Sequence, residues 1–441
     1  MTPALVRRGP MTDLFAANSA TDHSTTADAR RRGGWLPSSQ DALEDWLSGH
    51  RERVAAKGGQ AVLHPVLAEF QTLIDSDPVV RLYLNEMIAQ VPQNRHYRKR
   101  HLDSVQELLQ LINEVLTMAP EYSEDAMVVL PLGAILDWTM GTPAGFAAFR
   151  DRRINAMLKR ILSVWCEFLS SGDSRYVLND SPSGWKGEAA RAAIGIEQYQ
   201  HDPDDEYWGF SSWNDFFTRR LADGARPVDS PDDDGVIVSA CESTPYGVAV
   251  DVQLQDEFWI KSQPYSLRDM LGNDESARQF VGGTVYQAFL SATNYHRWHS
   301  PVAGKIVRAF TLEGTYYSEA DSEGADAAEP RNSQSYLAHV AARAVILIEA
   351  DNPVIGLTAF VPVGMSEVSS CMIDPKIEPE YHVEKGEELG YFQFGGSTHC
   401  LVFRPGAIAD FSLTAVPQPH LADPPLVRVR SRLATAASLK A

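Results

Sequence analysis

A serine that follows two glycines is the residue of this sequence best suited to covalent chemistry. The segment Phe394-Gly395-Gly396-Ser397-Thr398 comes directly after a strand-like run. Glycine allows a tight turn and lets another group approach the backbone closely. The carbonyl that precedes Ser397 is therefore open to attack by a hydroxyl. An ordinary junction between a strand and a turn has the same pattern, so both interpretations stay open at this point.

Two histidines three positions apart form the second candidate. His296 and His299 stand in the segment YHRWHSPV, residues 295–302. Imidazole titrates near neutral pH, so each ring could carry a catalytic proton. The spacing places both rings on one face only if the local backbone is a helical turn. Packing in the core is an alternative, and because no HExxH motif or third ligand is near, we predict no metal site.

Glu242 is a carboxylate in the apolar, strand-like run 238–243. A buried carboxylate needs a partner, and a histidine would be oriented by it as in a catalytic triad. A helix cap or a surface glutamate is the alternative. Taken together, Glu242, His299 and Ser397 have the residue types of an acid, a base and a nucleophile in chain order.

Several enzyme classes would leave motifs that this sequence lacks. Without a GxSxG elbow, an α/β-hydrolase is not expected. Without GxGxxG, a nicotinamide enzyme is not expected either. No lysine stands in a context typical of pyridoxal phosphate, so we predict no pyridoxal phosphate.

The hydrophobic periodicity predicts an α+β protein with a helical N-terminal domain and a mostly β catalytic domain. Residues 66–74, 79–91, 105–116 and 154–169 have helical spacing, and Ser104 with Glu107 forms a capping box. The runs 248–254, 345–348 and 357–363 indicate strands. We predict a disordered tail over 1–34, a helical domain over 35–204 and the catalytic domain over 205–441.

Composition narrows the class of partner and the compartment. The net charge of −19 over 441 residues argues against nucleic acid. No stretch of 18 apolar residues exists, so we expect no integral membrane association. The four cysteines are widely spaced without a CxxC pair, which favours a reducing cytoplasm.

Three separate motifs resemble the phosphatidylserine decarboxylase family. They are Gly395-Gly396-Ser397-Thr398, the YHRWHSPV segment, and residues 213–220 (WNDFFTRR) with Arg226-Pro227-Val228. Within the family the chain looks closest to the fungal tryptophan decarboxylases of the psilocybin pathway. That likeness extends through residues 240–243 (ACES) and 364–367 (GMSE). The lipid enzymes usually carry an aspartate where Glu242 stands.

The resemblance implies a self-cleaving enzyme. Its chain breaks between Gly396 and Ser397, and Ser397 becomes a pyruvoyl group, the cofactor, at the start of the fragment 397–441. His299 would be the base for cleavage, oriented by Glu242, and His296 the acid that protonates the product carbanion. Gly395 gives the turn, and Thr398 is the candidate donor to the oxyanion. The cleaved α and β chains would stay together, and a higher oligomer is possible.

The substrate that this resemblance favours is a free aromatic L-amino acid, with tryptophan first. Phosphatidylserine decarboxylation to phosphatidylethanolamine is the alternative. A third hypothesis is a lipoyl- or biotinyl-like binding module, because residues 383–389 (VEKGEEL) are similar to an edge of such folds. A plain serine hydrolase with the same three residues would leave the chain whole.

Overall fold

The computed structural model describes most of the chain from residue 40 onward. The described residues are 40–58, 62–91, 102–123, 130–256, 265–320, 333–365, 367, 370–418 and 424–438. The predicted tail, 1–34, lies outside them.

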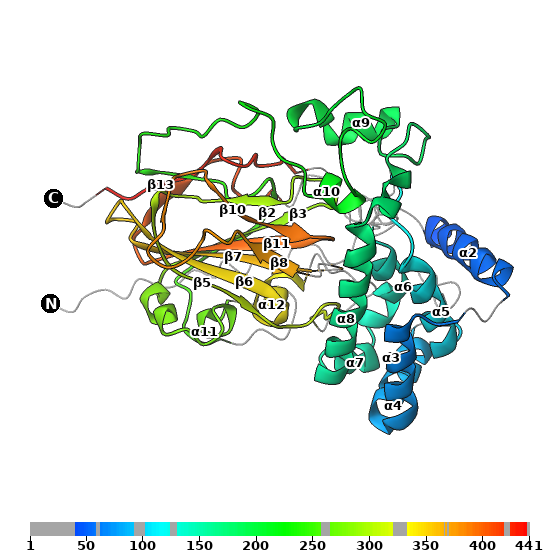
Figure 1. Cartoon of the computed structure of the whole chain (residues 1–441). Helices are drawn as coiled ribbons and strands as arrows, with labels where there is room; N and C mark the ends of the chain where they lie inside the picture. Colours follow the sequence, from blue (N-terminus) through cyan, green and yellow to red (C-terminus); the bar gives the residue numbers. More distant parts are fainter. Residues whose placement is uncertain are drawn as a thin grey trace, which may run out of the picture.

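Helices occupy the N-terminal part of the described chain (Figure 1). They are α2 (Gln40–Ala56), α3 (Pro65–Ser76), α4 (Pro78–Ala89), α5 (Val105–Val115), α6 (Pro131–Met140), α7 (Pro143–Ala148), α8 (Arg152–Leu169), α9 (Glu188–Ile194) and α10 (Trp213–Phe217). Three short 3₁₀ helices, η3 (Gly172–Val177), η4 (Ile196–Gln198) and η5 (Glu275–Phe280), accompany them and the β region. The Ser104 hydroxyl caps α5 by accepting the Glu107 N–H at 3.1 Å. The Glu107 carboxylate accepts the Asp103 N–H instead of the Ser104 N–H, so only half of the predicted capping box forms.

Strands dominate the rest of the described chain. They are β1 (Val236–Val238), β2 (Thr244–Val250), β3 (Thr284–Leu290), β4 (Arg297–His299), β5 (Gly304–Leu312), β6 (Arg343–Ala350), β7 (Leu357–Gly364), β8 (Ser370–Ile373), β9 (His382–Val383), β10 (Glu388–Gln393), β11 (Ser397–Phe403), β12 (Ile408–Phe411) and β13 (Arg432–Ala436). Two short helices, α11 (Leu267–Met270) and α12 (Gln334–Val340), lie between strands. The α+β prediction is confirmed.

One antiparallel sheet of seven strands carries the serine. Its order is β2-β3-β11-β7-β6-β5-β9, so β11 lies between β3 and β7. Ser397 is the first residue of β11, paired with Leu290 of β3 and Gly364 of β7. Two smaller sheets, β4-β10-β8 and β1-β13-β12, complete the β region. The glycine-serine junction therefore lies where a central strand begins.

One expectation about local structure is wrong, and one condition is not met. A helical turn, the condition for His296 and His299 to share one face, does not form, because Arg297–His299 pair with β10 as strand β4. The run 248–254 is a strand only as far as Val250, since Asp251 adopts a left-handed φ of 57° that ends it.

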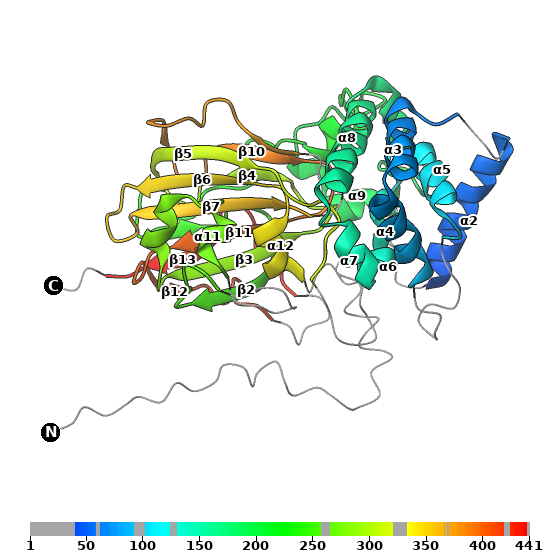
Figure 2. The ribbon, with the colours of Figure 1, turned by 90° about the horizontal axis from the view of Figure 1, so that it is seen from below.

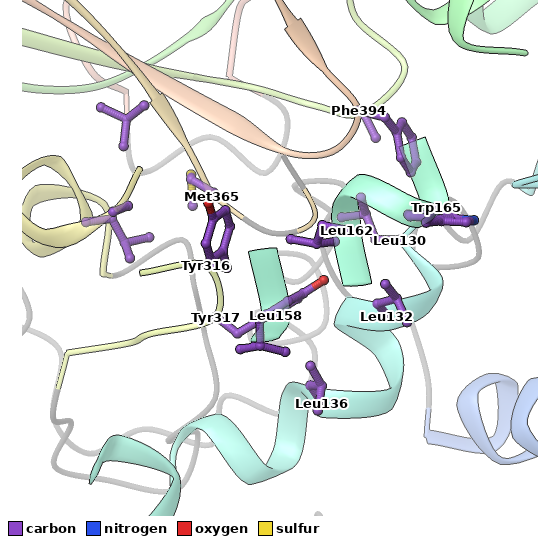
Figure 3. Packing of buried hydrophobic residues seen from close by; sticks show 14 of the residues in the cluster. Leu130, Leu132, Leu136, Leu158, Leu162, Trp165, Tyr316, Tyr317, Met365 and Phe394 are labelled. Atoms are coloured by element: carbon purple, nitrogen blue, oxygen red, sulfur yellow. The ribbon is translucent and has the colours of Figure 1, made fainter. Parts of the chain in front are cut away.

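The helical region meets the β region at the end of the sheet where β11 begins (Figures 1 and 2). A single apolar cluster contains buried residues of both regions. Figure 3 shows part of this cluster, which includes Leu162 and Trp165 of α8 and Met365 and Phe394 of the β region. Burial of this apolar surface stabilises the contact between the helical region and the β region. The helices therefore pack beside the glycine-serine junction.

Candidate active site

The turn before Ser397 is fixed on both sides. Gly395 has a φ of 128°, in the region that favours glycine. The carbonyl oxygen of Gly396 accepts a hydrogen bond from the Met365 N–H at 3.0 Å. Phe394 packs edge-on against Trp213, with 4.4 Å between ring centroids, and also against Trp165 (Figure 3). These contacts hold the Gly396–Ser397 peptide in one position.

Ser397 is fully buried, and its hydroxyl has no hydrogen-bond partner among the described residues. A buried polar group without a partner is uncommon in a folded protein, because it loses its hydrogen bonds to water. Such exceptions call for an explanation, and a reactive role is one of them. The Ser397 hydroxyl is therefore available for chemistry.

Thr398, by contrast, is held in a network of hydrogen bonds. Its hydroxyl lies 2.9 Å from the carbonyl oxygen of Ala288 and 2.9 Å from Gln334 Oε1. It also accepts a hydrogen bond from Gln287 Nε2 at 3.2 Å. The structure places the Met365 N–H, and not this hydroxyl, on the Gly396 carbonyl. The Thr398 hydroxyl is therefore held by other groups, and an oxyanion role of Thr398 stays a prediction.

His296 precedes β4 and is completely buried. Its ring stacks on Phe217, with 4.1 Å between centroids, and its Nδ1 lies 2.9 Å from the Asn294 carbonyl oxygen. Nδ1 must therefore carry the proton, which leaves a lone pair on Nε2. Nε2 has no partner in the part of the chain that the structure describes. Burial, with the nearby charge of Arg219, lowers the pKa of His296 to about 3.

His299, in β4, has both ring nitrogens engaged. Nδ1 lies 2.9 Å from the carbonyl oxygen of Gly386, and Nε2 lies 2.8 Å from the hydroxyl of Tyr295. Nδ1 is thus the donor, and Nε2 accepts from Tyr295. Burial, with the charge of Arg430, lowers the pKa of His299 to about 3. The imidazole is neutral at pH 7, as a base must be.

Glu242 does not orient His299. Its two carboxylate oxygens accept hydrogen bonds from Arg226 Nε at 2.9 Å and Nη2 at 2.8 Å, and both side chains are buried. The pair raises the pKa of Arg226, first through the hydrogen bond with Glu242. A buried guanidinium needs a carboxylate more than a neutral imidazole does. The predicted contact of Glu242 with His299 is corrected to an ion pair with Arg226.

The structure therefore brings together only part of the predicted set. Ser397 makes no hydrogen bond to His296 or His299, both of which are described. Sequence reasoning missed three groups that contact the predicted residues: the Met365 N–H, Tyr295 and Arg226. Tyr295 and Arg226 stand in two of the family motifs, and Met365 stands in the segment 364–367 that extends the likeness. A backbone donor or a residue beside a histidine, however, has no sequence pattern of its own. Among the described residues, no group of three or more His, Cys, Asp or Glu could hold a metal ion.

Comparison with known proteins identifies the family. Two family models described as phosphatidylserine decarboxylase match residues 64–194 and 213–421. The L-tryptophan decarboxylase of Psilocybe cubensis is 35% identical over 88% of this chain and 92% of its own length. Decarboxylase iboD of Amanita muscaria is 42% identical over 66% of this chain and 89% of its own. The phosphatidylserine decarboxylase proenzyme of Bacillus mycoides is 33% identical over 47% of this chain and 74% of its own.

The matches extend across both the helical region and the sheet that carries Ser397. Relatives that match nearly the whole chain are themselves named decarboxylases. The chain therefore belongs to the phosphatidylserine decarboxylase family and is a carboxy-lyase.

Proposed function

We propose that this chain cleaves itself between Gly396 and Ser397 and then decarboxylates a free aromatic L-amino acid, with L-tryptophan as the first candidate. One observation carries the proposal. The Ser397 hydroxyl is buried without a described partner, directly after a carbonyl that the Met365 N–H already holds. A nucleophile and a donor to its oxyanion thus flank the same peptide bond.

Cleavage needs a base, an attack and an elimination. A histidine takes the proton of the Ser397 hydroxyl, and Oγ attacks the Gly396 carbonyl carbon. Negative charge then develops on the oxygen that accepts the Met365 N–H. The proton taken by the histidine passes to the Ser397 nitrogen as the C–N bond breaks, which gives an ester. A base then removes the proton on the Ser397 Cα, and loss of the Gly396 carboxylate leaves dehydroalanine at position 397. Water converts this residue into a ketone and releases ammonia.

We assign the base to His299. The Gly386 carbonyl fixes its tautomer with the lone pair on Nε2. That nitrogen must exchange the Tyr295 hydroxyl for the Ser397 hydroxyl before cleavage. His296 is then the group that protonates the substrate carbon during turnover. Its Nε2 has no described partner and carries no proton at rest, so it first takes the proton that the substrate ammonium group gives up and then passes it to the carbon.

The residues around Ser397 fit a pyruvoyl group, because the hydroxyl from which it would form is buried at a strand terminus and has no partner among the described residues. The group supplies an electron sink for the bond that holds the departing carboxylate. The chain contributes an enclosed, largely apolar setting, in which Phe217 and Phe394 pack together with 5.0 Å between centroids. Apolar surroundings disfavour a hydrated carboxylate and so favour its loss.

The choice of an amino acid rests on the relatives and on the apolar setting. Two tryptophan decarboxylases match 86–88% of this chain, whereas the phosphatidylserine decarboxylase proenzyme of Bacillus mycoides matches 47%. No helix within the described ranges is long and apolar enough to cross a membrane. Phosphatidylserine remains the second candidate substrate, because the two family models that match the chain are described as phosphatidylserine decarboxylase.

The test combines maturation with a substrate panel. The purified chain is incubated with L-tryptophan, L-tyrosine, L-phenylalanine or phosphatidylserine vesicles, and the amines are measured by mass spectrometry. We expect tryptamine as the main product. Ser397→Ala should leave one intact chain without activity. Ser266→Ala, another fully buried serine, serves as the matched control and should be cleaved normally. Phosphatidylethanolamine as the main product would overturn the choice of substrate.

A further inference from the structure

A glutamate lies two residues beyond the amide that holds the scissile carbonyl. Met365 donates to the Gly396 oxygen at 3.0 Å, and Glu367 follows in the same connection after β7. Glu367 is 1% exposed and has a φ of 67°. A left-handed conformation is strained for a residue other than glycine and persists only when its surroundings hold it. The position of Glu367 is therefore imposed by its contacts.

The contact that holds Glu367 comes from the helical region. Its Oε1 accepts the Gly133 N–H at 2.6 Å, across 234 positions of sequence. Gly133 is in the first turn of α6, where N–H groups have no partner within the helix. The N-cap residue of α6 is Leu130, whose side chain cannot accept a hydrogen bond. Glu367 thus supplies the cap that α6 lacks.

Apolar packing surrounds this hydrogen bond. Figure 3 shows Leu130 and Leu132 of the α6 start in the same cluster as Met365 and Leu162 of α8. Burial raises the pKa of Glu367 well above its usual range, while the N–H groups of Gly133 and Leu132 act in the opposite direction. A neutral carboxyl can still accept the Gly133 N–H through its carbonyl oxygen. Glutamine should therefore reproduce the contact.

We propose that Glu367 is a positioning residue for self-cleavage: by accepting the Gly133 N–H, it docks α6 onto the segment that holds the Met365 N–H against the Gly396 carbonyl. The helical region then acts on cleavage through one hydrogen bond at the site itself. This inference rests on the proposed self-cleavage and adds the residue that prepares its oxyanion contact.

The experiment compares Glu367→Met with Glu367→Gln. Methionine keeps the length and approximate volume of the side chain but removes the acceptor, so it leaves no large cavity. We expect Glu367→Met to slow formation of the 397–441 fragment by about tenfold or more, because a displaced oxyanion donor loses part of its effect. Glu367→Gln should remain within about threefold of wild type, as the neutral acceptor is kept. Fragment formation is followed by intact mass over time, and folding by circular dichroism.

Glu313→Met is the matched control. Glu313 also joins the β region to the helical region, through an ion pair with Lys159, but its side chain is 75% exposed. The Glu313→Met chain should be cleaved at the wild-type rate. If Glu367→Met does not fold, Glu367→Asp, whose carboxylate is one methylene short of Gly133, takes its place and should also be slow.

Two outcomes would overturn the inference. One is wild-type cleavage in a folded Glu367→Met or Glu367→Asp chain. The other is a Glu367→Gln chain as slow as the methionine variant, because charge rather than acceptance would then matter. A wild-type chain that never cleaves would instead overturn the proposed function, so the two failures are distinguishable.

Discussion

The two hydroxyl residues that begin β11 differ sharply in their surroundings. The Thr398 hydroxyl has three groups within hydrogen-bonding distance, whereas the Ser397 hydroxyl has none among the described residues, although both side chains are fully buried. A satisfied buried group stabilises a fold, and an unsatisfied one destabilises it. Thr398 therefore holds the start of the strand in place, and Ser397 is free to react.

The two histidines repeat this contrast. His299 has partners on both nitrogens, whereas His296 has one on Nδ1 and none described on Nε2. We assign cleavage to His299 and turnover to His296, so substituting each histidine in turn should affect a different step.

Histidine variants should give the largest effects. Because it removes the base, His299→Ala should slow cleavage by about 10²–10⁴-fold. His296→Ala should be cleaved but lose turnover by a similar factor, because the product carbanion lacks its proton donor. Cleavage is measured by intact mass and turnover by amine release. If His296→Ala stays whole while His299→Ala is cleaved, the ring with the free nitrogen is the base and our assignment is reversed.

Glu242→Gln distinguishes two roles of the Glu242 carboxylate: an ion pair with Arg226 and the acid of a catalytic triad. The change leaves the buried Arg226 without a countercharge, so we expect a loss of about 3 kcal/mol in the free energy of unfolding. Urea denaturation of uncleaved Ser397→Ala chains, with and without the change, measures it. When Ser397 is present, the Glu242→Gln chain should still be cleaved. A folded Glu242→Gln chain that stays whole would show that the carboxylate serves cleavage after all.

Thr398→Val tests whether the hydrogen bonds of the Thr398 hydroxyl stabilise the fold. Loss of the Thr398 hydroxyl removes the described partner of Gln334 Oε1 and one of the two acceptors of Gln287 Nε2, so unfolding should become easier by about 1–3 kcal/mol. Thr358→Val is the matched control, because the Thr358 hydroxyl is buried without a described partner on β7. The control should be neutral or stabilising. Equal losses in the two variants would contradict the contrast between satisfied and unsatisfied hydroxyls.

The smallest expected effect, about 1 kcal/mol for each histidine between pH 7 and 5.5, is a dependence of stability on pH. The pKa values of His296 and His299 are lowered to about 3, while an unfolded histidine titrates near 6.5. The unfolded chain therefore binds more protons between these values. Stability is fully present above pH 6.5 and falls as the pH drops toward 3, by about 1.4 kcal/mol per unit for each histidine. Urea midpoints of Ser397→Ala at pH 7 and 5.5 should differ, and less so after His296→Phe. An unchanged difference would mean that His296 is not buried in its neutral form.

The sequence predicted the elements better than their contacts. Helical spacing around Ile154 and Leu162 gives α8 because periodicity records which face is buried. Gly395 marks the turn before Ser397 because few other residues adopt its backbone conformation. The partner of Glu242 was out of reach, since charge alone does not say whether a distant arginine or histidine lies closer. The Met365 N–H was also out of reach, because every residue except proline carries the same donor.

Intact mass of the purified wild-type chain under denaturing conditions tests the central claim most directly. We expect two polypeptides from the 48.7 kDa chain, 1–396 and 397–441. The second has a mass of about 5 kDa by its share of the length and is lighter by one ammonia than the same peptide starting with serine. A single unmodified chain of 48.7 kDa in a preparation that releases carbon dioxide from its substrate would contradict the account.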